Sequence, residues 1–321
     1  MEIYCLLTVN GRRYSSKKTG MSRNTSKILI LGHGEIGRAM EYLLQSHHTL
    51  TTWERHPKTT SPVDLESASS RQDVIFFCLP ASPHFGLATR LRKHLRQDCL
   101  CVSVAKGLDD EGRTAAQALA QALGPQALIS VLYGPMISEE IRAGCVAFAQ
   151  AGTAQTGTYA RLLELFAGTS LYLEHTTDIE GISWAAVLKN VYAILFGVAD
   201  ELGLGDNMRG YLAAEAMGEM ERIITGLGGS AGAGQRLAGL GDLITTATSK
   251  GSHHHELGRR LVRGEFSQLQ GEGVHTWKMI QAYRLFDLRQ YPLFHLIDKL
   301  LAEPATARTQ IKNFLTESQG V

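Results

Sequence analysis

A lysine and an asparagine lie in the middle of an otherwise apolar run. Residues 182–199 read ISWAAVLKNVYAILFGVA, with Lys189 and Asn190 near the centre. Burying an ammonium group without a partner is unfavourable by several kcal/mol, or it lowers the pKa of the lysine toward neutrality. A lysine with a lowered pKa can donate a proton in one direction of a reaction and accept it in the other. Lys189 is therefore the first candidate for general acid and base chemistry.

The run that carries this lysine contains no proline and is rich in Ala, Leu and Val, which favours a helix. The residues one turn away from Lys189, none of them acidic, are Ala185, Ala186, Tyr192 and Ala193. A partner for the charge must therefore come from a distant part of the chain. Two alternatives remain open: the lysine reaches water along its own stem, or the run spans a membrane. The central polar pair and the lack of a second such run argue against a membrane span.

Three glycines near the start of the chain suggest a second kind of chemistry. Gly32, Gly34 and Gly37 follow a short apolar strand and precede an amphipathic stretch, in G-x-G-x-x-G spacing. In that context the first glycine permits a tight turn, the second lets backbone approach a pyrophosphate, and the third allows close packing of helix on strand. The helix N-terminus supplies free N–H groups to the phosphates. The segment predicts a dinucleotide site.

The residues that distinguish NAD from NADP follow the next expected strand. That strand covers residues 49–53 and is followed by Glu54 and Arg55. An acid at this place binds the ribose 2′-hydroxyl of NAD, whereas an arginine accommodates the 2′-phosphate of NADP. Because both residue types are present, the cofactor is NAD or NADP and the preference stays open.

Further strands and helices place these residues in a fold. Strands are expected at 74–79, 100–104, 128–132 and 170–174, with helices at 87–95 and 114–123. This alternation predicts a Rossmann-type doubly wound parallel sheet, and ligands bind at the carboxyl ends of its strands. Lys106 directly follows one strand and is a candidate contact for an anion or a carbonyl, or else an ordinary surface lysine.

The second half is expected to be all α-helical. Helices are predicted at 182–202, 211–228, 232–247, 255–262, 275–286 and 293–302. We therefore expect a dinucleotide-binding domain over 21–177 and a helical substrate domain over 178–321, with the active site between them. Residues 1–20 lack the cleavage pattern of a signal peptide, and we interpret them as a disordered extension or a misplaced start before Met21.

Composition excludes several classes of partner. The 321 residues carry 32 basic and 31 acidic side chains, for a net charge of +1, with no long block of one sign. This balance gives no reason to expect a nucleic acid or an anionic membrane as partner. The five cysteines form no C-x-x-C pair, which suits reduced thiols in a cytoplasmic protein.

The sequence resembles the soluble, bacterial-type NAD(P)-dependent glycerol-3-phosphate dehydrogenases over residues 27–315. The similar segments are GHGEIG at 32–37, Lys106-Gly107, Gly134-Pro135 with Glu139-Glu140, LKNVYAILFGVADELGLGDN at 188–207, GEMERI at 218–223, GLGDLITTATS at 239–249 and Gly271-Glu272-Gly273. The long middle segment and the Gly-Asp-Leu block are specific to this family, whereas the glycine pattern alone is not. The resemblance implies interconversion of dihydroxyacetone phosphate and sn-glycerol 3-phosphate, in support of phospholipid synthesis, by a homodimer.

The resemblance also implies roles for residues at matching positions. Lys189, Lys106 and Asp242 would be catalytic, with Asp242 as the distant partner of Lys189, although a cap in a Gly-Asp-Leu turn is the alternative for that acid. The implied substrate contacts are Lys106, Gly134, Asn190, Thr246, Ser252, His253 and His254. The implied cofactor contacts are Gly32, Gly34, Glu35, Ile36, Gly37, Glu54, Arg55, Lys106, Ser138 and Glu272.

Three departures from the family pattern bear on the substrate. Members usually follow the serine at position 252 with arginine and asparagine, but this chain has His253, His254 and His255. Histidine offers no planar fork for a phosphate and is only partly charged at pH 7, so phosphate would be bound more weakly. Consecutive histidines point in different directions, and we expect no metal site. Glu35 inside the phosphate loop is unfavourable unless it turns away, and Met136 replaces a small polar residue.

Three hypotheses for function follow. The first is the dehydrogenase activity of the family. The second is a related reductase of another small ketone, which need not carry a phosphate, selected by the histidines. The third is a nucleotide-binding protein with weak or no catalysis, against which the presence of Lys106, Lys189 and Asp242 argues.

Overall fold

The computed structural model describes residues 25–55, 63–249, 251–266 and 270–317. One sheet of seven strands organises the first half, in the order β2-β1-β3-β4-β5-β6-β7. Its strands are β1 (Lys27–Leu31), β2 (Thr49–Trp53), β3 (Val74–Phe77), β4 (Leu100–Ser103), β5 (Leu128–Tyr133), β6 (Ala147–Thr153) and β7 (Leu171–Thr176). All neighbours are parallel except β5 and β6, which are antiparallel. The expected doubly wound, mostly parallel sheet is confirmed.

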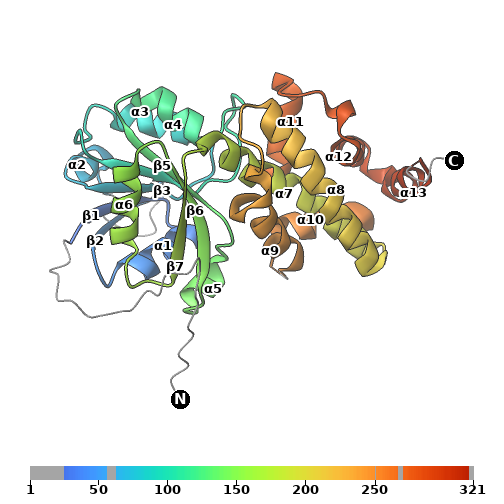
Figure 1. Cartoon of the computed structure of the whole chain (residues 1–321), viewed down its shortest axis with the longest axis horizontal. Coiled ribbons are helices and arrows are strands. Elements are labelled where there is room, and N and C mark those ends of the chain that lie inside the picture. Colours follow the sequence, from blue (N-terminus) through green and yellow to red (C-terminus); the bar gives the residue numbers. More distant parts are fainter. Residues whose placement is uncertain (1–24, 56–62, 250, 267–269, 318–321) are drawn as a thin grey trace, which may run out of the picture.

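Helices cover both faces of this sheet because successive strand residues point to opposite sides. On one face Ile28 and Ile30 pack with apolar residues of α1 (Glu35–Leu44), α5 (Ser138–Arg142) and α6 (Thr156–Leu165). On the other face Leu29 and Leu31 pack with α2 (Leu65–Ser69), α3 (His84–Leu91) and α4 (Ala115–Leu123). Figure 1 shows α3 and α4 above the sheet and α1 below it.

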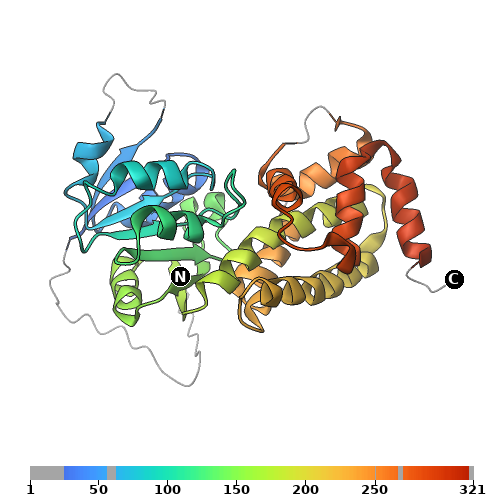
Figure 2. The same ribbon diagram turned by 90° about the horizontal axis from the view of Figure 1, so that it is seen from above.

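The second half forms a separate helical lobe, seen beside the sheet in Figures 1 and 2. Its helices are α7 (Ile179–Glu201), α8 (Gly205–Gly226), α9 (Asp242–Thr248), α10 (His253–Arg263), α11 (Glu272–Tyr283), α12 (Pro292–Ala302) and α13 (Ala307–Glu317). In Figure 2 the helices of the C-terminal end lie far from the sheet, whereas α7 begins beside it.

Helix α7 is the axis of the helical lobe. Every residue from Gly181 to Ala199 is buried, so the helix is apolar all round because other elements surround it. Among the described residues it is the one helix long and apolar enough to cross a membrane, and its apolar stretch is wholly buried inside the protein. The apolar composition is thus explained by the core of the lobe.

Two glycines bring α7 and α10 into backbone contact. A Cβ atom at Gly197 would lie 1.8 Å from the carbonyl oxygen of His255, and one at Gly258 would lie 2.0 Å from the carbonyl oxygen of Ile194. Neither distance is physically possible, so the helices approach this closely only because both residues are glycine. The contact sets the position of the first turn of α10, which carries the three histidines.

A buried carboxylate fastens a third helix to this pair. Glu219 of α8 is 2% exposed and accepts hydrogen bonds from the hydroxyl of Tyr192 at 2.8 Å and from the backbone N–H groups of Leu293 and Phe294 at 2.7 and 3.0 Å. It thereby satisfies free N–H groups in the first turn of α12. Glu219 is a structural residue that links α7, α8 and α12.

The structure corrects one expectation about local structure and contains elements that were not predicted. Residues 232–247 are not one helix, because the extended backbone at Arg236 (φ −106°, ψ −163°) separates the short helical turn Ala233–Gln235 from Leu237–Gly241, which leads directly into α9. Strand β6 and helix α13 were not predicted. The expectations for residues 1–20 and for a start at Met21 lie outside the described residues.

Replacing Gly258 with alanine tests the backbone contact. We expect Gly258→Ala to lower the free energy of unfolding by about 3 kcal/mol or more, at the upper end of overpacking effects, because backbone cannot move aside. The control is Gly210→Ala in α8, where a Cβ meets nothing within 4 Å and the residue is exposed. That change should stabilise by up to about 1 kcal/mol. Urea unfolding curves of both variants measure the difference, and equal effects would contradict the contact.

Candidate active site

The buried lysine has its partner on a distant helix. Lys189 is 5% exposed, and its Nζ donates to Thr246 Oγ1 at 2.7 Å and lies 3.2 Å from Asp242 Oδ2. Asp242 begins α9 and is itself only 3% exposed. These contacts exclude the alternative in which the lysine extends to water. They also supply the acid that the turns of α7 next to Lys189 lack.

A second lysine shares the same carboxylate oxygen. Lys106 follows β4, and its Nζ donates to Asp242 Oδ2 at 2.8 Å and to the carbonyl oxygen of Gly134 at 2.9 Å. Gly134 has φ of +154°, and a Cβ there would lie 2.5 Å from the carbonyl oxygen of Phe148, so the close turn after β5 requires glycine. The ion pair between Lys106 and Asp242 joins the sheet lobe to the helical lobe at the carboxyl ends of β4 and β5.

The charges of this cluster lower the proton affinity of Lys189. Burial lowers the pKa of Lys189 to about 8; Asp242 opposes this and Lys106 adds to it. Glu272, at the start of α11, is half-buried, and burial raises the pKa of its carboxyl group. Two ammonium groups thus share one buried carboxylate. Such a site stabilises negative charge that develops on a bound molecule.

Asn190 adds an unused acceptor beside the lysines. Its Nδ2 donates to the carbonyl oxygen of Lys106 at 3.0 Å, whereas its Oδ1 is buried without a hydrogen-bond partner among the described residues. A buried acceptor without a partner is unfavourable by about 1–3 kcal/mol unless a ligand donates to it. The geometry therefore fits a bound molecule with a hydroxyl or amide donor.

The glycine loop has the form that a dinucleotide requires. Gly32 has φ of +92°, and a Cβ there would lie 2.5 Å from Leu79, while a Cβ at Gly37 would lie 2.1 Å from the carbonyl oxygen of Gly32. At Gly34, by contrast, nothing lies within 4 Å, and this open position precedes α1. The two tight glycines shape the turn, and the open one leaves room for a pyrophosphate at the helix N-terminus. Ile36, half-buried, packs on the core below.

Glu35 turns away from the phosphate position. It forms ion pairs with Arg38 of α1 and with Arg142 of α5, the latter at 2.5 Å. Arg142 also donates to the carbonyl oxygen of Ser138 at 3.4 Å, which places Ser138 beside this pair. The unfavourable charge expected inside the loop is thus balanced by two guanidinium groups.

The three histidines have three different environments. His253 is exposed and His255 is buried, with Nε2 2.8 Å from Asp200 Oδ2. His254 lies between them, and its Nδ1 would be 3.1 Å from a Cβ at Gly273 on α11. Burial, followed by the charge of Lys189, lowers the pKa of His254 to about 3. His254 is therefore neutral at pH 7 and brings no positive charge to the site.

The remaining predicted residues do not join the lysine cluster. Ser252 caps α10, since its Oγ accepts from the backbone N–H of His255 at 3.3 Å. Glu54 and Arg55 lie after β2, beside the glycine loop, where Glu54 is 3.3 Å from His33 and Arg55 is exposed. Among the described residues, no group of three or more His, Cys, Asp or Glu side chains has the geometry of a metal site.

Sequence reasoning missed a buried network under the loop of Lys106. His84 is fully buried; its Nδ1 lies 2.9 Å from the carbonyl oxygen of Pro80 and its Nε2 lies 2.8 Å from Ser103 Oγ. Burial lowers the pKa of His84 to about 4, so the ring is neutral at pH 7. A carbonyl can only accept; Nδ1 therefore carries the proton, and Ser103 donates to Nε2. Ser103 in turn accepts from the N–H of Ala105 at 3.2 Å.

This network ties together two loops that follow neighbouring strands. Pro80 belongs to the loop after β3, and Ala105 directly precedes Lys106 after β4. The signal in the sequence was Ser103, a polar residue in an otherwise apolar buried strand.

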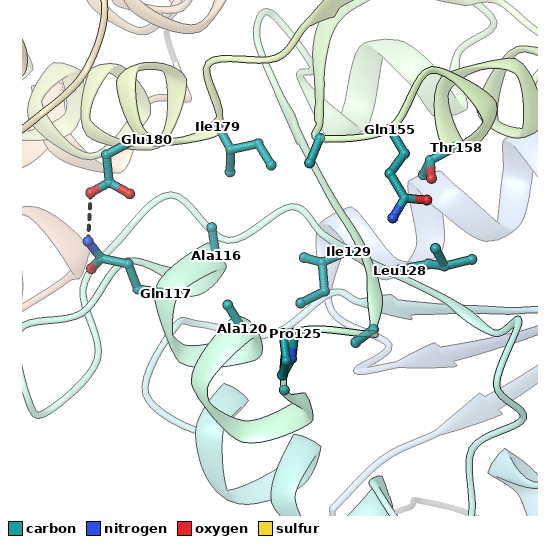
Figure 3. A pocket seen from close by; sticks show the side chains of 13 residues that line it. Ala116, Gln117, Ala120, Pro125, Leu128, Ile129, Gln155, Thr158, Ile179 and Glu180 are labelled. Carbon is teal, nitrogen blue, oxygen red and sulfur yellow. Dashed lines mark hydrogen bonds between the residues drawn. The ribbon is translucent and has the colours of Figure 1, made fainter.

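One cavity among the described residues lies away from the lysines. It has a volume of about 270 Å³ and is lined in part by Leu128 and Ile129, where β5 begins, whereas the lysines lie where β4 and β5 end. Figure 3 shows Glu180 and Gln117 at one end of this cavity, where the Gln117 amide donates to the carboxylate at 2.6 Å. Because its carboxylate is bonded within the protein and no lysine lines it, the cavity is separate from the lysine cluster.

Removing the hydroxyl of Ser103 tests the network. Ser103→Ala leaves the Nε2 of His84 and the N–H of Ala105 without partners, and we expect it to lower the free energy of unfolding by about 1–3 kcal/mol. The amide proton of Ala105 should also exchange faster. Ser70→Ala, which removes a hydroxyl bonded to Ser67 at the surface, is the control and should change stability by less than about 0.5 kcal/mol. Unchanged exchange at Ala105 would contradict the network.

Two family models match the chain. The model for the N-terminus of NAD-dependent glycerol-3-phosphate dehydrogenase matches residues 60–157, and the model for the C-terminus of the same enzyme matches residues 178–312. The two matches include β3 to β6 of the sheet lobe and both Lys189 and Asp242 of the helical lobe.

Curated relatives and a solved structure agree with these matches. Glycerol-3-phosphate dehydrogenase (NAD(P)+) of Agrobacterium fabrum is 33% identical over 271 residues, which cover 76% of this chain and 82% of that protein. The enzyme of the same name from Acaryochloris marina is 30% identical and covers 91% of this chain. The crystal structure of glycerol-3-phosphate dehydrogenase from Coxiella burnetii shares the fold, with a TM-score of 0.79 at 22% identity over 91% of this chain and 99% of that one. This chain belongs to the NAD(P)-dependent glycerol-3-phosphate dehydrogenase family.

Proposed function

We propose that the protein interconverts dihydroxyacetone phosphate and sn-glycerol 3-phosphate, with Lys189 as the proton donor and acceptor. The observation that carries the proposal is the buried Lys189 ammonium, which shares the Asp242 carboxylate with Lys106. This pair lies beyond the carboxyl ends of β4 and β5, on the side of the sheet where a bound dinucleotide is expected. Family membership supports the substrate pair.

Each residue of the cluster has a different role in the reduction of the ketone. When bound, the reduced nicotinamide supplies a hydride to the carbonyl carbon. Negative charge then develops on the carbonyl oxygen, and the Lys189 ammonium protonates it. Lys106 stabilises the same charge, and Asp242 keeps both ammonium groups in place. In the oxidation of the alcohol, neutral Lys189 accepts the proton.

Other side chains orient the substrate. Asn190 Oδ1, which has no partner among the described residues, accepts from a substrate hydroxyl, and Thr246 holds Lys189 at 2.7 Å. The first turn of α10 faces this cluster through His254. Because His254 is neutral, the binding of a phosphate depends on backbone and neutral donors there. His253 replaces the arginine that members of the family usually carry, and this difference favours, as a second candidate, a related reaction on a small ketone without a phosphate.

The proposed reaction also suggests where the enzyme works and what its product is used for. We propose that the product supplies glycerophospholipid synthesis, that the enzyme is cytoplasmic, and that it works as a homodimer. The described cysteines Cys78, Cys99, Cys101 and Cys145 are free thiols, which suits a reducing compartment. The near-neutral charge balance gives no reason to expect a nucleic acid as partner.

A pH profile tests Lys189 directly. Since its pKa is about 8, kcat/KM for reduction should fall above about pH 8, where the ammonium is lost, and kcat/KM for oxidation should fall below that pH. Lys189→Met should lower kcat by about 100- to 10,000-fold without weakening cofactor binding. Lys278→Met, an exposed lysine of α11, is the control. If both variants turn over dihydroxyacetone phosphate at the same rate, Lys189 has no part in the chemistry.

Restoring a cation to α10 distinguishes the two substrates. The double variant His253→Arg, His254→Asn supplies the guanidinium fork that binds phosphate. We expect KM for dihydroxyacetone phosphate to fall by about tenfold or more, because a charge-assisted hydrogen bond contributes about 1.5–3 kcal/mol. Steady-state kinetics with dihydroxyacetone phosphate and dihydroxyacetone measure the change. A gain on both ketones alike would mean that the histidines do not face the phosphate.

A further inference from the structure

One carboxylate lies immediately beside the glycine loop. The N–H of Gly32 donates to the carbonyl oxygen of Trp53 at 2.8 Å, which fixes the end of β2 against the start of the loop. Glu54 is the next residue, and its side chain is 33% exposed. Its carboxylate is therefore held near the loop and remains accessible to a ligand bound there.

A histidine of the loop sets the direction of this carboxylate. His33 stands between Gly32 and Gly34, with Nδ1 3.3 Å from Glu54 Oε1 and Nε2 2.7 Å from Glu41 Oε2. One imidazole thus lies between two carboxylates, one on α1 and one after β2. The contact draws Glu54 toward the loop instead of into solvent.

Two guanidinium groups near the loop, those of Arg38 and Arg142, are engaged with the protein. Arg38 donates to the carbonyl oxygen of His33 at 3.0 Å and pairs with Glu35, which also pairs with Arg142. Arg55 is exposed, and the described part of the chain gives it no ion pair. Among the described residues, a phosphate placed at the end of β2 would therefore meet the carboxylates of Glu54 and Glu41, and no cation held by an ion pair there faces it.

We propose that Glu54, positioned by His33, makes the enzyme select NAD(H) over NADP(H). A carboxylate at the end of the second strand accepts hydrogen bonds from the ribose hydroxyls of NAD, and it repels the 2′-phosphate of NADP. Glu54 is the specificity-determining residue, and His33 is a positioning residue that acts through it. The inference rests on the proposed function, because it concerns the dinucleotide used in that reaction.

Direct binding of the two reduced dinucleotides tests the inference without turnover. Full-length protein is titrated with NADH and with NADPH, and nicotinamide fluorescence gives both dissociation constants. We expect the wild type to bind NADH about tenfold or more tightly than NADPH. Glu54→Gln should reduce this ratio by about tenfold, mainly by tightening NADPH. Glu164→Gln, an exposed acid of α6, is the matched control and should leave the ratio unchanged.

The positioning role of His33 has a separate signature. His33→Gln should reduce the same ratio by less than Glu54→Gln, and it should change the ratio little when Glu54 is already glutamine. Glu54→Asp should retain part of the preference, as a rescue by the conservative variant. A ratio of dissociation constants is insensitive to the fraction of protein that folds, because the misfolded part binds neither dinucleotide.

The outcomes separate this inference from the proposed function. Equal binding of the two dinucleotides by the wild type, tighter binding of NADPH, or an unchanged ratio in Glu54→Gln would overturn the role of Glu54. Preference for NADH in a protein that fails to turn over dihydroxyacetone phosphate would leave the inference standing and overturn the proposed function instead.

Discussion

The carboxylate of Asp242 is the contact on which the arrangement of the site depends. Its Oδ2 lies 2.8 Å from Lys106 and 3.2 Å from Lys189, and all three side chains are largely withdrawn from water. Without this acid, a buried ammonium at Lys189 would be strongly unfavourable, or the lysine would be neutral at pH 7. The same contact joins the loop after β4 to α7 and α9, so the electrostatic requirement of one lysine also fixes how the two lobes meet.

Backbone packing is what allows this carboxylate to reach the lysines. The turn before α9 is tight because Gly239 lies against Gly234, and the N–H of Ala238 donates to the side chain of Gln150 on β6 at 3.0 Å. On the other side of α7, Gly197 and Gly258 bring α10 into contact at the backbone. Small residues therefore set the distances at which the charged residues meet, since a Cβ at these positions would push the elements apart.

The sequence predicted much of the fold because its signals are local. Three signals depend only on residues that are close together in the chain. They are the short apolar strands, the spacing of Gly32, Gly34 and Gly37, and the apolar run around Lys189. Strand β6 gave no such signal, because its residues AFAQAGT are mostly alanine and glycine, which are depleted in strands. The broken helix before Asp242 was missed for the opposite reason: its glycines are needed for a tertiary contact rather than by local preference.

In the site, too, the features that depend on neighbouring residues were predicted, and the contacts between distant residues were not. The lack of an acid around Lys189 predicted a distant partner, but the choice of Asp242 came from the resemblance, since 53 positions separate the two residues. The network of His84 and Ser103 was missed because His84 begins α3 and Ser103 ends β4, 19 positions apart in the chain. The orientation of Glu35 toward Arg38 and Arg142 was equally beyond local patterns, because Arg142 is 107 positions away.

His254, in the histidine triplet, and Lys189 affect each other's pKa through their charges. His255 is used structurally: it contacts Asp200, which also pairs with Arg209 at 2.7 Å. His254 lies near enough to Lys189 for the ammonium to lower its pKa, and by the same electrostatics a permanent cation at that position would lower the pKa of Lys189. A neutral residue at position 254 leaves Lys189 protonated over a wider pH range, whereas the attraction for a substrate phosphate depends on position 253, where members of the family usually carry arginine. The charges in the first turn of α10 therefore affect both the binding of a substrate phosphate and the protonation of Lys189.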